Sequence, residues 1–233
     1  MKEMIELDER LCTALPFLRP ADRIADIGTD HAFLPIYAVR NGLCSEALAT
    51  DINEGPVQRA MEHIRRCGLE EKITVMKTDG LVGVESFGPD TILIFGMGGE
   101  LIAGILSKTQ WIRKKGTRLI LQPMTHDEIL RAFLYENGFK IFHETISRAQ
   151  GRLYVTIAAE YDGTVRSFTR KDCWLGELAG PLGDGPVDLW FEKKKDKVQK
   201  IIREMARHGV SPDEKCTEEL AAFSEALKLV KVK

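Results

Sequence analysis

The sequence predicts an α/β fold in which a mostly parallel sheet is closed by an antiparallel hairpin and followed by an antiparallel pair of helices. Apolar runs of strand length alternate with helical patterns through the first half of the chain, as in a doubly wound sheet. Two later strand-like runs, 139–148 and 152–161, are separated by a turn too short for a helix. Two amphipathic stretches, 187–208 and 212–230, end the chain.

The individual elements follow from hydrophobic periodicity and from Gly and Pro positions. Parallel strands are expected at residues 23–27, 47–50, 73–76, 90–95 and 118–121. Helices are expected at residues 3–15, 31–41, 56–67 and 100–106. The turn between the two C-terminal helices is Gly209-Val210-Ser211-Pro212, in which Ser211 is expected to cap the second helix. The apolar positions expected to join these helices are Leu189, Trp190, Val198, Ile201, Ile202 and Met205 on the first, and Leu220, Phe223, Leu227 and Val230 on the second. We therefore expect one domain over residues 1–161 and a helical domain over residues 162–233.

Composition narrows the class of protein. The chain has 233 residues, of which 44% are hydrophobic and 29% are charged, enough for one full α/β core and a small appendage. Its five cysteines form no C-x-x-C motif or Cys/His cluster, so we expect no disulfide framework and no bound metal. No apolar run reaches the roughly 20 residues that cross a membrane, and no signal peptide is recognisable. These features predict a cytoplasmic protein without a membrane partner.

The loop after the first predicted strand indicates the ligand. The first strand ends in Asp26 and Gly28, and the second ends in Asp51, whose carboxylate can accept hydrogen bonds from both hydroxyls of a ribose. The loop lacks the Gly-x-Gly-x-x-Gly pattern of pyrophosphate sites. It carries two acids instead, Asp26 and Asp30, which would repel phosphate but attract a sulfonium and an α-ammonium group. The sequence therefore favours S-adenosylmethionine over NAD.

Four motifs together resemble those of one family. They are DIGTDHAFLP at 26–35, TDG at 78–80, GMGG at 96–99 and QPM at 122–124. With the helical tail, this combination resembles the bacterial tRNA adenine-22-N1-methyltransferase family over nearly the whole chain, and Asp30 in place of a second loop glycine is the pattern of that family. The resemblance implies a Rossmann-like class I methyltransferase fold, S-adenosylmethionine as the cofactor and tRNA as the partner. It also implies methyl transfer to N1 of adenine 22.

The expected cofactor site lies at the carboxyl ends of the first four strands. Asp26 is expected to bind the ammonium of the methionine end, Asp51 the ribose and Asp79 the adenine amino group. Asp26 and Asp79 could instead be ordinary turn residues, and His31 could make a structural hydrogen bond at a helix start. The full predicted set is Asp26, Gly28, Thr29, His31, Asp51, Ile52, Asn53, Asp79, Gly80, Gly96, Met97 and Gly98.

The loop at residues 96–99 stands where exocyclic-amine methyltransferases carry Asn/Asp-Pro-Pro-aromatic. It offers neither a side-chain acceptor nor an aromatic ring, which favours a ring nitrogen over N6 or N4. The N1 lone pair is available at neutral pH, so direct transfer without a covalent intermediate needs mainly positioning of an unpaired base. Asp30 is the predicted catalytic residue, because a carboxylate can stabilise the positive charge that develops on the ring, although it could serve the cofactor instead. The glycines could also reflect close packing of a helix on a strand.

The predicted RNA contacts lie mainly in the tail. Residues 192–208 contain seven Lys or Arg against three Asp or Glu, on a chain with a net charge of −2. Lys193, Lys194 and Lys195 are expected to contact phosphates, which supply affinity rather than sequence choice. Gln122 and Pro123 are further predicted substrate contacts, and residues 113–118 form a second basic cluster. A Lys-rich helix face can equally be only solvated.

Two other functions remain open on sequence grounds. The first is a methyltransferase acting on another RNA, a small molecule or a protein, which would show activity without tRNA. The second is a non-catalytic scaffold that binds the cofactor and uses the helical tail to recruit a partner.

Overall fold

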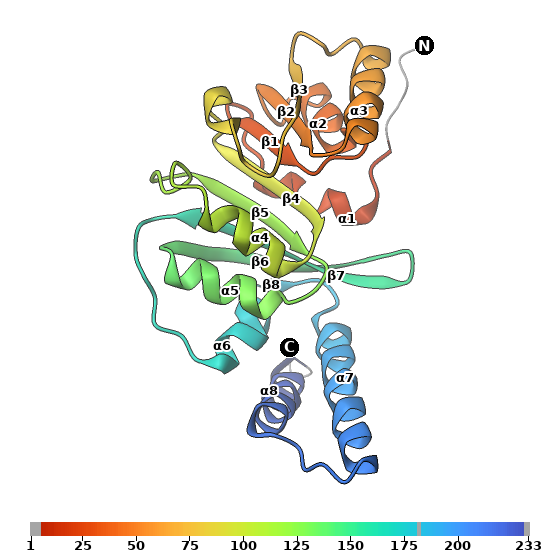
Figure 1. Ribbon diagram of the computed structural model, residues 1–233, viewed down its shortest axis with the longest axis vertical. Coiled ribbons are helices and arrows are strands. Elements are labelled where there is room, and N and C mark those ends of the chain that lie inside the picture. The colour runs from red at the N-terminus through yellow and green to blue at the C-terminus, as the bar shows by residue number, and fades with distance from the viewer. Residues whose placement is uncertain (1–5, 181–182, 231–233) are drawn as a thin grey trace.

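A single mixed sheet runs through the protein (Figure 1). The computed structural model describes residues 6–180 and 183–230, and within them the sheet has eight strands in the order β3-β2-β1-β4-β5-β7-β6-β8. The strands are β1 Arg23–Ile27, β2 Glu46–Asp51, β3 Ile73–Lys77, β4 Thr91–Met97, β5 Arg118–Pro123, β6 Phe139–Ala149, β7 Arg152–Tyr161 and β8 Gly183–Asp184.

The sheet confirms the predicted topology. Strands β1 to β5 pair in parallel, whereas β7 lies antiparallel to both β5 and β6. Gln150 and Gly151 connect β6 to β7 with φ angles of 49° and 74°. Two consecutive residues with positive φ are typical of the tight turn whose twist matches a two-stranded ribbon. The antiparallel hairpin therefore closes the parallel part of the sheet, as expected.

Helices cover both faces of the sheet (Figure 1). One face packs against α2 and α3, and the other packs against α4 and α5, because alternate strand residues such as Ile24 and Ala25 point to opposite faces. The helices are α1 Glu9–Cys12, α2 Phe33–Arg40, α3 Glu54–Cys67, α4 Gly99–Ser107, α5 Asp127–Glu136, α6 Arg170–Leu175, α7 Val187–Arg207 and α8 Glu214–Val230, with short 3-10 turns at Leu15–Phe17, Val84–Phe87 and Gly176–Ala179.

One helical prediction needs correction, and two helices were not predicted. The N-terminal helix expected at 3–15 is the single turn α1, which starts after Asp8, whose side chain accepts a hydrogen bond from the Arg10 backbone N–H at 2.9 Å. Residues 3–5 of that expected helix lie outside the described part. Helices α5 and α6 were not predicted, although Thr169 and Asp172 form a capping box at the start of α6.

The tail forms the expected antiparallel helix pair, and most of the predicted contact positions pack there (Figure 1). Trp190, Val198, Phe223 and Leu227 are buried, and Ile202 and Leu220 pack against the same cluster. Phe191 is fully buried against Phe223 of α8, with ring centroids 6.1 Å apart, whereas Leu189 and Ile201 are exposed. The prediction was therefore wrong for Leu189 and Ile201 and missed Phe191, since α7 also packs on the catalytic domain. Asp213, not Ser211, caps α8 by accepting the Cys216 N–H at 2.7 Å.

The segment after residue 161 packs on the sheet as well as forming the helix pair. Strand β8 pairs in parallel with β6, and one hydrophobic cluster continues from the sheet into α7 and α8. The sequence Leu-Ala-Gly-Pro-Leu-Gly at 178–183 predicts a turn, of which residues 181–182 lie outside the described part. Gly185, just after this turn, lies very close to β6. A Cβ on Gly185 would lie 2.0 Å from the Ile146 carbonyl oxygen. The division at 161/162 stays a prediction, since the core continues across it.

A buried ion network fastens the tail to the catalytic domain. Arg131 of α5 has no exposed surface and donates to Glu144 at 2.8 Å, to Asp127 at 2.7 Å and to the Cys173 carbonyl at 2.9 Å. Lys194 of α7 forms an ion pair with the other oxygen of Asp127. Burial alone would raise the pKa of Asp127, but the charges of Lys194 and Arg131 outweigh it and lower the pKa to about 2.

Candidate functional site

The loop after β1 is built around a buried carboxylate. Asp26 is only 7% exposed, and its burial raises the pKa to about 6, opposed by a hydrogen bond with Thr29 and by the charge of Arg10. Gly28 has a φ of +78°, which a residue with a side chain rarely adopts. The amides of Gly28 and Thr29 both donate to the Thr50 carbonyl at 2.8 Å, which fixes the loop against the end of β2.

The end of β2 presents a second carboxylate. Asp51 Oδ1 accepts the backbone N–H of Asn53 at 2.7 Å, so one oxygen orients the group while the other has no partner in the described part of the chain. The Asp51 carbonyl accepts the Thr78 N–H at 3.0 Å, which brings the loop after β3 beside it. Ile52 exposes its side chain next to Asp51. This arrangement suits a ribose diol next to an apolar surface.

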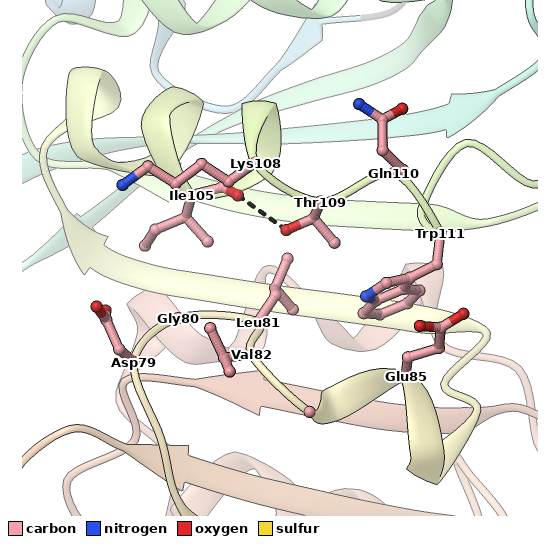
Figure 2. A pocket seen from close by; sticks show the side chains of 11 residues that line it. Asp79, Gly80, Leu81, Val82, Glu85, Ile105, Lys108, Thr109, Gln110 and Trp111 are labelled. Atoms are coloured by element: carbon pink, nitrogen blue, oxygen red, sulfur yellow. Dashed lines mark hydrogen bonds between the residues drawn. The ribbon is translucent and has the colours of Figure 1, made fainter.

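A cavity of about 670 Å³ lies beside the loop after β3 (Figure 2). Asp79 and Gly80 lie at one end of it in Figure 2, and Trp111 and Glu85 lie at the other. A Cβ on Gly80 would lie 3.0 Å from Ile105 Cγ2, so a larger residue would press on α4. The cavity is lined by Asp79, Gly80, Leu81, Val82, Gly83, Glu85, Ile105, Lys108, Thr109, Gln110 and Trp111.

The glycines at the end of β4 and the start of α4 have different roles. Gly96 has a φ of +80° at an irregularity in the pairing of β4 with β5, and it is exposed. Met97 reaches over the β1 loop, where a Cβ on Gly28 would lie 2.3 Å from its Cε. A Cβ on Gly99 would lie 2.2 Å from the His126 carbonyl oxygen, so Gly99 permits close packing at the start of α4. The packing explanation therefore holds for Gly99, while Gly96 and Gly98 stay cofactor predictions.

Asp30, the predicted catalytic residue, has two cationic or potentially cationic neighbours. Its carboxylate accepts from Arg59 Nε at 3.0 Å and lies 3.1 Å from His31 Nε2. Beside it, the rings of His31, Phe33 and His63 lie nearly parallel, with centroids 5.0 to 5.4 Å apart. Phe33 is 36% exposed. Asp30 itself is exposed, and the structure places beside it an arginine and an aromatic cluster that the sequence pattern did not reveal.

Gln122 does not lie where substrate could reach it. Its side chain has 0% exposure and accepts from Arg10 Nη1 at 3.1 Å, while its own Nε2 donates to the Arg10 carbonyl at 3.1 Å and to Thr156 Oγ1 at 3.0 Å. Pro123 is buried as well. In this structure the residue holds the N-terminal segment, which corrects the expectation of a direct substrate contact. The role of Arg10 was missed because 112 residues separate it from Gln122.

The lysine run on α7 is divided between two environments. Lys193 is exposed, whereas Lys194 pairs with Asp127 and lies 4.9 Å from the centre of the Trp190 ring. Lys195 is half-buried near α8. The exposed basic residues of α7 recur at helical spacing and define a stripe, called here the α7 basic stripe: Lys193, Lys197, Lys200, Arg203 and Arg207.

In the second basic cluster, at residues 113–118, the two arginines bind other parts of the protein, while Lys114 and Lys115 are exposed. Arg113 donates to the Asn137 side chain at 2.9 Å, and Arg118 donates to Glu160 at 3.0 Å and to the Phe17 carbonyl at 3.1 Å.

Within residues 6–180 and 183–230, no group of His, Cys, Asp and Glu is arranged to hold a metal. No helix of the same residues is long and apolar enough to cross a membrane.

Comparison with known proteins places the chain in a family. A family model described as a methyltransferase domain matches residues 7–157. The tRNA (adenine(22)-N(1))-methyltransferase of Bacillus subtilis (strain 168) is 35% identical over 190 residues, which cover 82% of this chain and 80% of that protein. The chain belongs to the tRNA (adenine(22)-N(1))-methyltransferase family. This membership confirms the resemblance seen in the four motifs.

Solved structures of the tRNA (adenine(22)-N(1))-methyltransferase family share the whole architecture. The B. subtilis M1A22 tRNA methyltransferase TrmK matches with a TM-score of 0.79 and 30% identity, covering 98% of each chain. Streptococcus pneumoniae Sp1610, solved in complex with S-adenosyl-L-methionine, matches with a TM-score of 0.80 and 30% identity, covering 95% of this chain and 100% of that one. The predicted Rossmann-like methyltransferase fold with its C-terminal helices is therefore confirmed, while the roles of individual residues stay predictions.

Proposed function

We propose that this protein transfers the methyl group of S-adenosylmethionine to N1 of adenine 22 in tRNA, directly and without a covalent intermediate. The observation that carries the proposal is the 35% identity to the B. subtilis enzyme of that name across 82% of the chain. The relative Sp1610 was solved with S-adenosyl-L-methionine, which supports the choice of methyl donor. A cytoplasmic location follows from a tRNA substrate.

The donor site that we propose uses one carboxylate from each of three strand ends. Asp51 has one carboxylate oxygen without a partner in the described chain and would accept from the ribose hydroxyls. Asp79, exposed at one end of the 670 Å³ cavity, would accept from the adenine amino group (Figure 2). Asp26 would meet the α-ammonium group. The cofactor supplies an electrophilic methyl group on a sulfonium, and these residues orient it.

The acceptor site that we propose lies above Gly96 at the end of β4. The exposed Gly96 leaves room for a flat base, and the loop carries no side chain that would hold an exocyclic amine. N1 lies on the pairing edge of adenine, so the base must be presented unpaired. Asp30 would stabilise the cationic ring of the product, and Arg59, which donates to Asp30 at 3.0 Å, would set the position of that carboxylate.

The tRNA would be held in part by the α7 basic stripe. Lys193, Lys197 and Lys200 are exposed on one helix face and can contact phosphates without breaking an internal ion pair. Lys194 is expected to hold α7 on the catalytic domain through its pair with Asp127 instead of contacting the tRNA. Phosphate contacts of this kind orient a nucleic acid and make its affinity strongly dependent on salt.

Methylation of an unmodified tRNA pool with labelled S-adenosylmethionine tests the proposal. Nucleoside analysis should place the label in 1-methyladenosine, and fragment mapping should place it at position 22. Label in N6-methyladenosine or in a cytidine would overturn the assignment of the acceptor atom. Methyl transfer to a protein or a small molecule without tRNA would favour the first alternative function, and cofactor binding without any transfer would favour the scaffold.

The contribution of the tail is tested by reversing three charges of the stripe. The variant K193E/K197E/K200E should bind S-adenosylmethionine normally but bind tRNA much more weakly, with a salt slope lower by about one unit per lost phosphate contact. The matched control K72E/K140E/K228E changes the net charge equally at exposed positions elsewhere. Equal losses in both variants would show a general charge effect and remove the stripe from the proposed interface.

A further inference from the structure

Three aromatic rings form a stack at the surface beside Asp30. The ring centroid of His31 lies 5.0 Å from that of Phe33 at an interplanar angle of 7°, and 5.1 Å from that of His63 at 20°. The rings of Phe33 and His63 are 5.4 Å apart at 14°. Phe33 is exposed and both histidines are partly exposed, so part of this flat surface is open to solvent. We call these three residues the aromatic platform.

The platform is held by an unusual backbone conformation and by a contact from α3. Ala32, between His31 and Phe33, has a φ of 54° and a ψ of 27°, in the left-handed region that a residue with a Cβ seldom adopts. The Ala32 N–H donates to Thr29 Oγ1 at 3.1 Å, and His63 Nδ1 lies 3.2 Å from the His31 carbonyl oxygen. In a regular helix, side chains two residues apart point about 200° apart and could not stack. Strained residues of this kind cluster at ligand-binding sites.

The charges beside the platform suit a nucleotide. Asp30 alone would repel a phosphate, but Arg59 donates to its carboxylate from Nε at 3.0 Å and also from Nη2. The third nitrogen, Arg59 Nη1, has no hydrogen-bond partner within residues 6–180 and 183–230, and the side chain is exposed. An aromatic face beside a neutralised carboxylate can take any nucleobase, because stacking uses the π face that all bases share.

The platform lies next to the proposed acceptor site without being part of it. The acceptor site is at Gly96 in β4, and β4 pairs with β1, whose loop leads into the platform. Helices α2 and α3 pack against β1, β2 and β3, on the other side of β1 from β4 (Figure 1). The two places are therefore neighbours along the carboxyl edge of the sheet, and one base cannot occupy both.

We propose that the aromatic platform stacks the nucleobase next to adenine 22, on one side of it, when that adenine enters the acceptor site. The inference rests on the proposed function, which makes tRNA the substrate, and adds a contact that neither the acceptor loop nor the α7 basic stripe supplies. An adenine that leaves the stack costs free energy, because its neighbour loses a stacking partner. Phe33 replaces that partner, and His31 and His63 are positioning residues that hold the Phe33 ring.

A cycle that combines a protein variant with an abasic tRNA tests the proposal. The full chain is titrated with a synthetic tRNA that is intact, or that lacks the base at position 21 or at position 23. F33L should bind the intact tRNA about 5- to 100-fold more weakly than the wild type, the range for loss of one base–aromatic stack. Removal of the stacked base should cost the wild type a similar factor, and F33L should then bind this tRNA within about twofold of the wild type.

Three comparisons separate stacking from other roles of Phe33. F33Y and F33W keep an aromatic ring, so each should bind tRNA within about threefold of the wild type. F33L should keep the wild-type affinity for S-adenosylmethionine, and its salt slope should be unchanged because no phosphate contact is lost. The matched control F168L removes a partly buried ring that contacts Tyr135 at a centroid distance of 5.7 Å, and it should bind tRNA as the wild type does.

The possible results separate the inference from the proposed function. A loss of tRNA affinity in F33L that disappears with one of the abasic tRNAs supports the inference. If F33L binds intact tRNA as the wild type does, or if neither abasic tRNA removes its defect, the inference is overturned. Weaker S-adenosylmethionine binding by F33L also overturns it and assigns the platform to the methyl donor.

The wild-type protein alone decides the question if F33L does not fold, because equal affinity for all three tRNAs overturns the inference. All of these results leave the proposed function intact. A wild-type protein that transfers no methyl group to tRNA defeats the proposed function, and the inference fails with it.

Discussion

Replacing Lys194 by methionine should destabilise the protein although the residue lies in a lysine-rich helix. The neighbouring cations lower the pKa of Asp127 from 3.8 to about 2, which corresponds to about 2.5 kcal/mol of stability at neutral pH. Arg131 remains as one partner in K194M, and the methionine keeps most of the apolar stem. We therefore expect a loss of about 2 kcal/mol, equivalent to a melting temperature lower by roughly 4–8 °C.

Urea denaturation at several pH values is the suitable assay. Because the folded pKa of Asp127 is depressed, its stabilising contribution is present above about pH 4 and is lost as the pH falls towards 2. The difference between wild type and K194M should therefore be largest near pH 7 and should shrink below about pH 4. K193M, at the exposed neighbouring position, should change stability by less than about 0.5 kcal/mol. Equal effects of K194M and K193M at pH 7 would refute the argument.

Three further predictions concern the cofactor loops and α4. Asp26 must be ionised to bind an ammonium, and its burial raises its pKa to about 6. The affinity for the donor, measured by calorimetry, should therefore be full above about pH 7 and should fall by up to tenfold per pH unit below about pH 6. D26N should weaken donor binding and flatten this pH dependence. D51A should weaken donor binding by roughly 1.5–4 kcal/mol, and unchanged affinity would remove Asp51 from the ribose site. G99A should lower the free energy of unfolding by about 1–3 kcal/mol in urea denaturation, because its Cβ would lie 2.2 Å from the His126 carbonyl oxygen. A Cβ at Gly104, on the same helix, would meet nothing within 4 Å, so G104A should raise the free energy of unfolding by up to about 1 kcal/mol.

Local patterns in the sequence were sufficient for the sheet and for the loops that end its strands. Alternating apolar runs predicted the strands, and the short turn at Gln150 and Gly151 predicted the antiparallel hairpin, because both depend on neighbouring residues. The positions of Asp26 and Asp51 at strand ends follow from the same reasoning. These parts of the candidate site could be predicted because each is determined within a few residues of the chain.

Contacts between distant segments could not be predicted in this way. The pair of Arg59 with Asp30 spans 29 residues, and that of Lys194 with Asp127 spans 67. Nothing in a lysine run distinguishes the lysine that pairs with a buried carboxylate from its solvated neighbours. Phe191 of α7 was missed for a related reason, because it turns inward towards a surface that periodicity within one helix does not describe.

The pairing of β8 with β6 has a consequence for the order in which the chain is made. Strand β6 lies at the outer side of the hairpin, and β8 is the strand that pairs with it there, at Glu144 and Thr145. An uncovered strand edge can pair with another chain and so promotes aggregation. Since Gly183 is synthesised 34 residues after Ala149, the last residue of β6, the nascent protein carries an open edge until its last quarter is synthesised. The edge of β6 at Glu144 and Thr145 is therefore covered only when the start of the tail has been made.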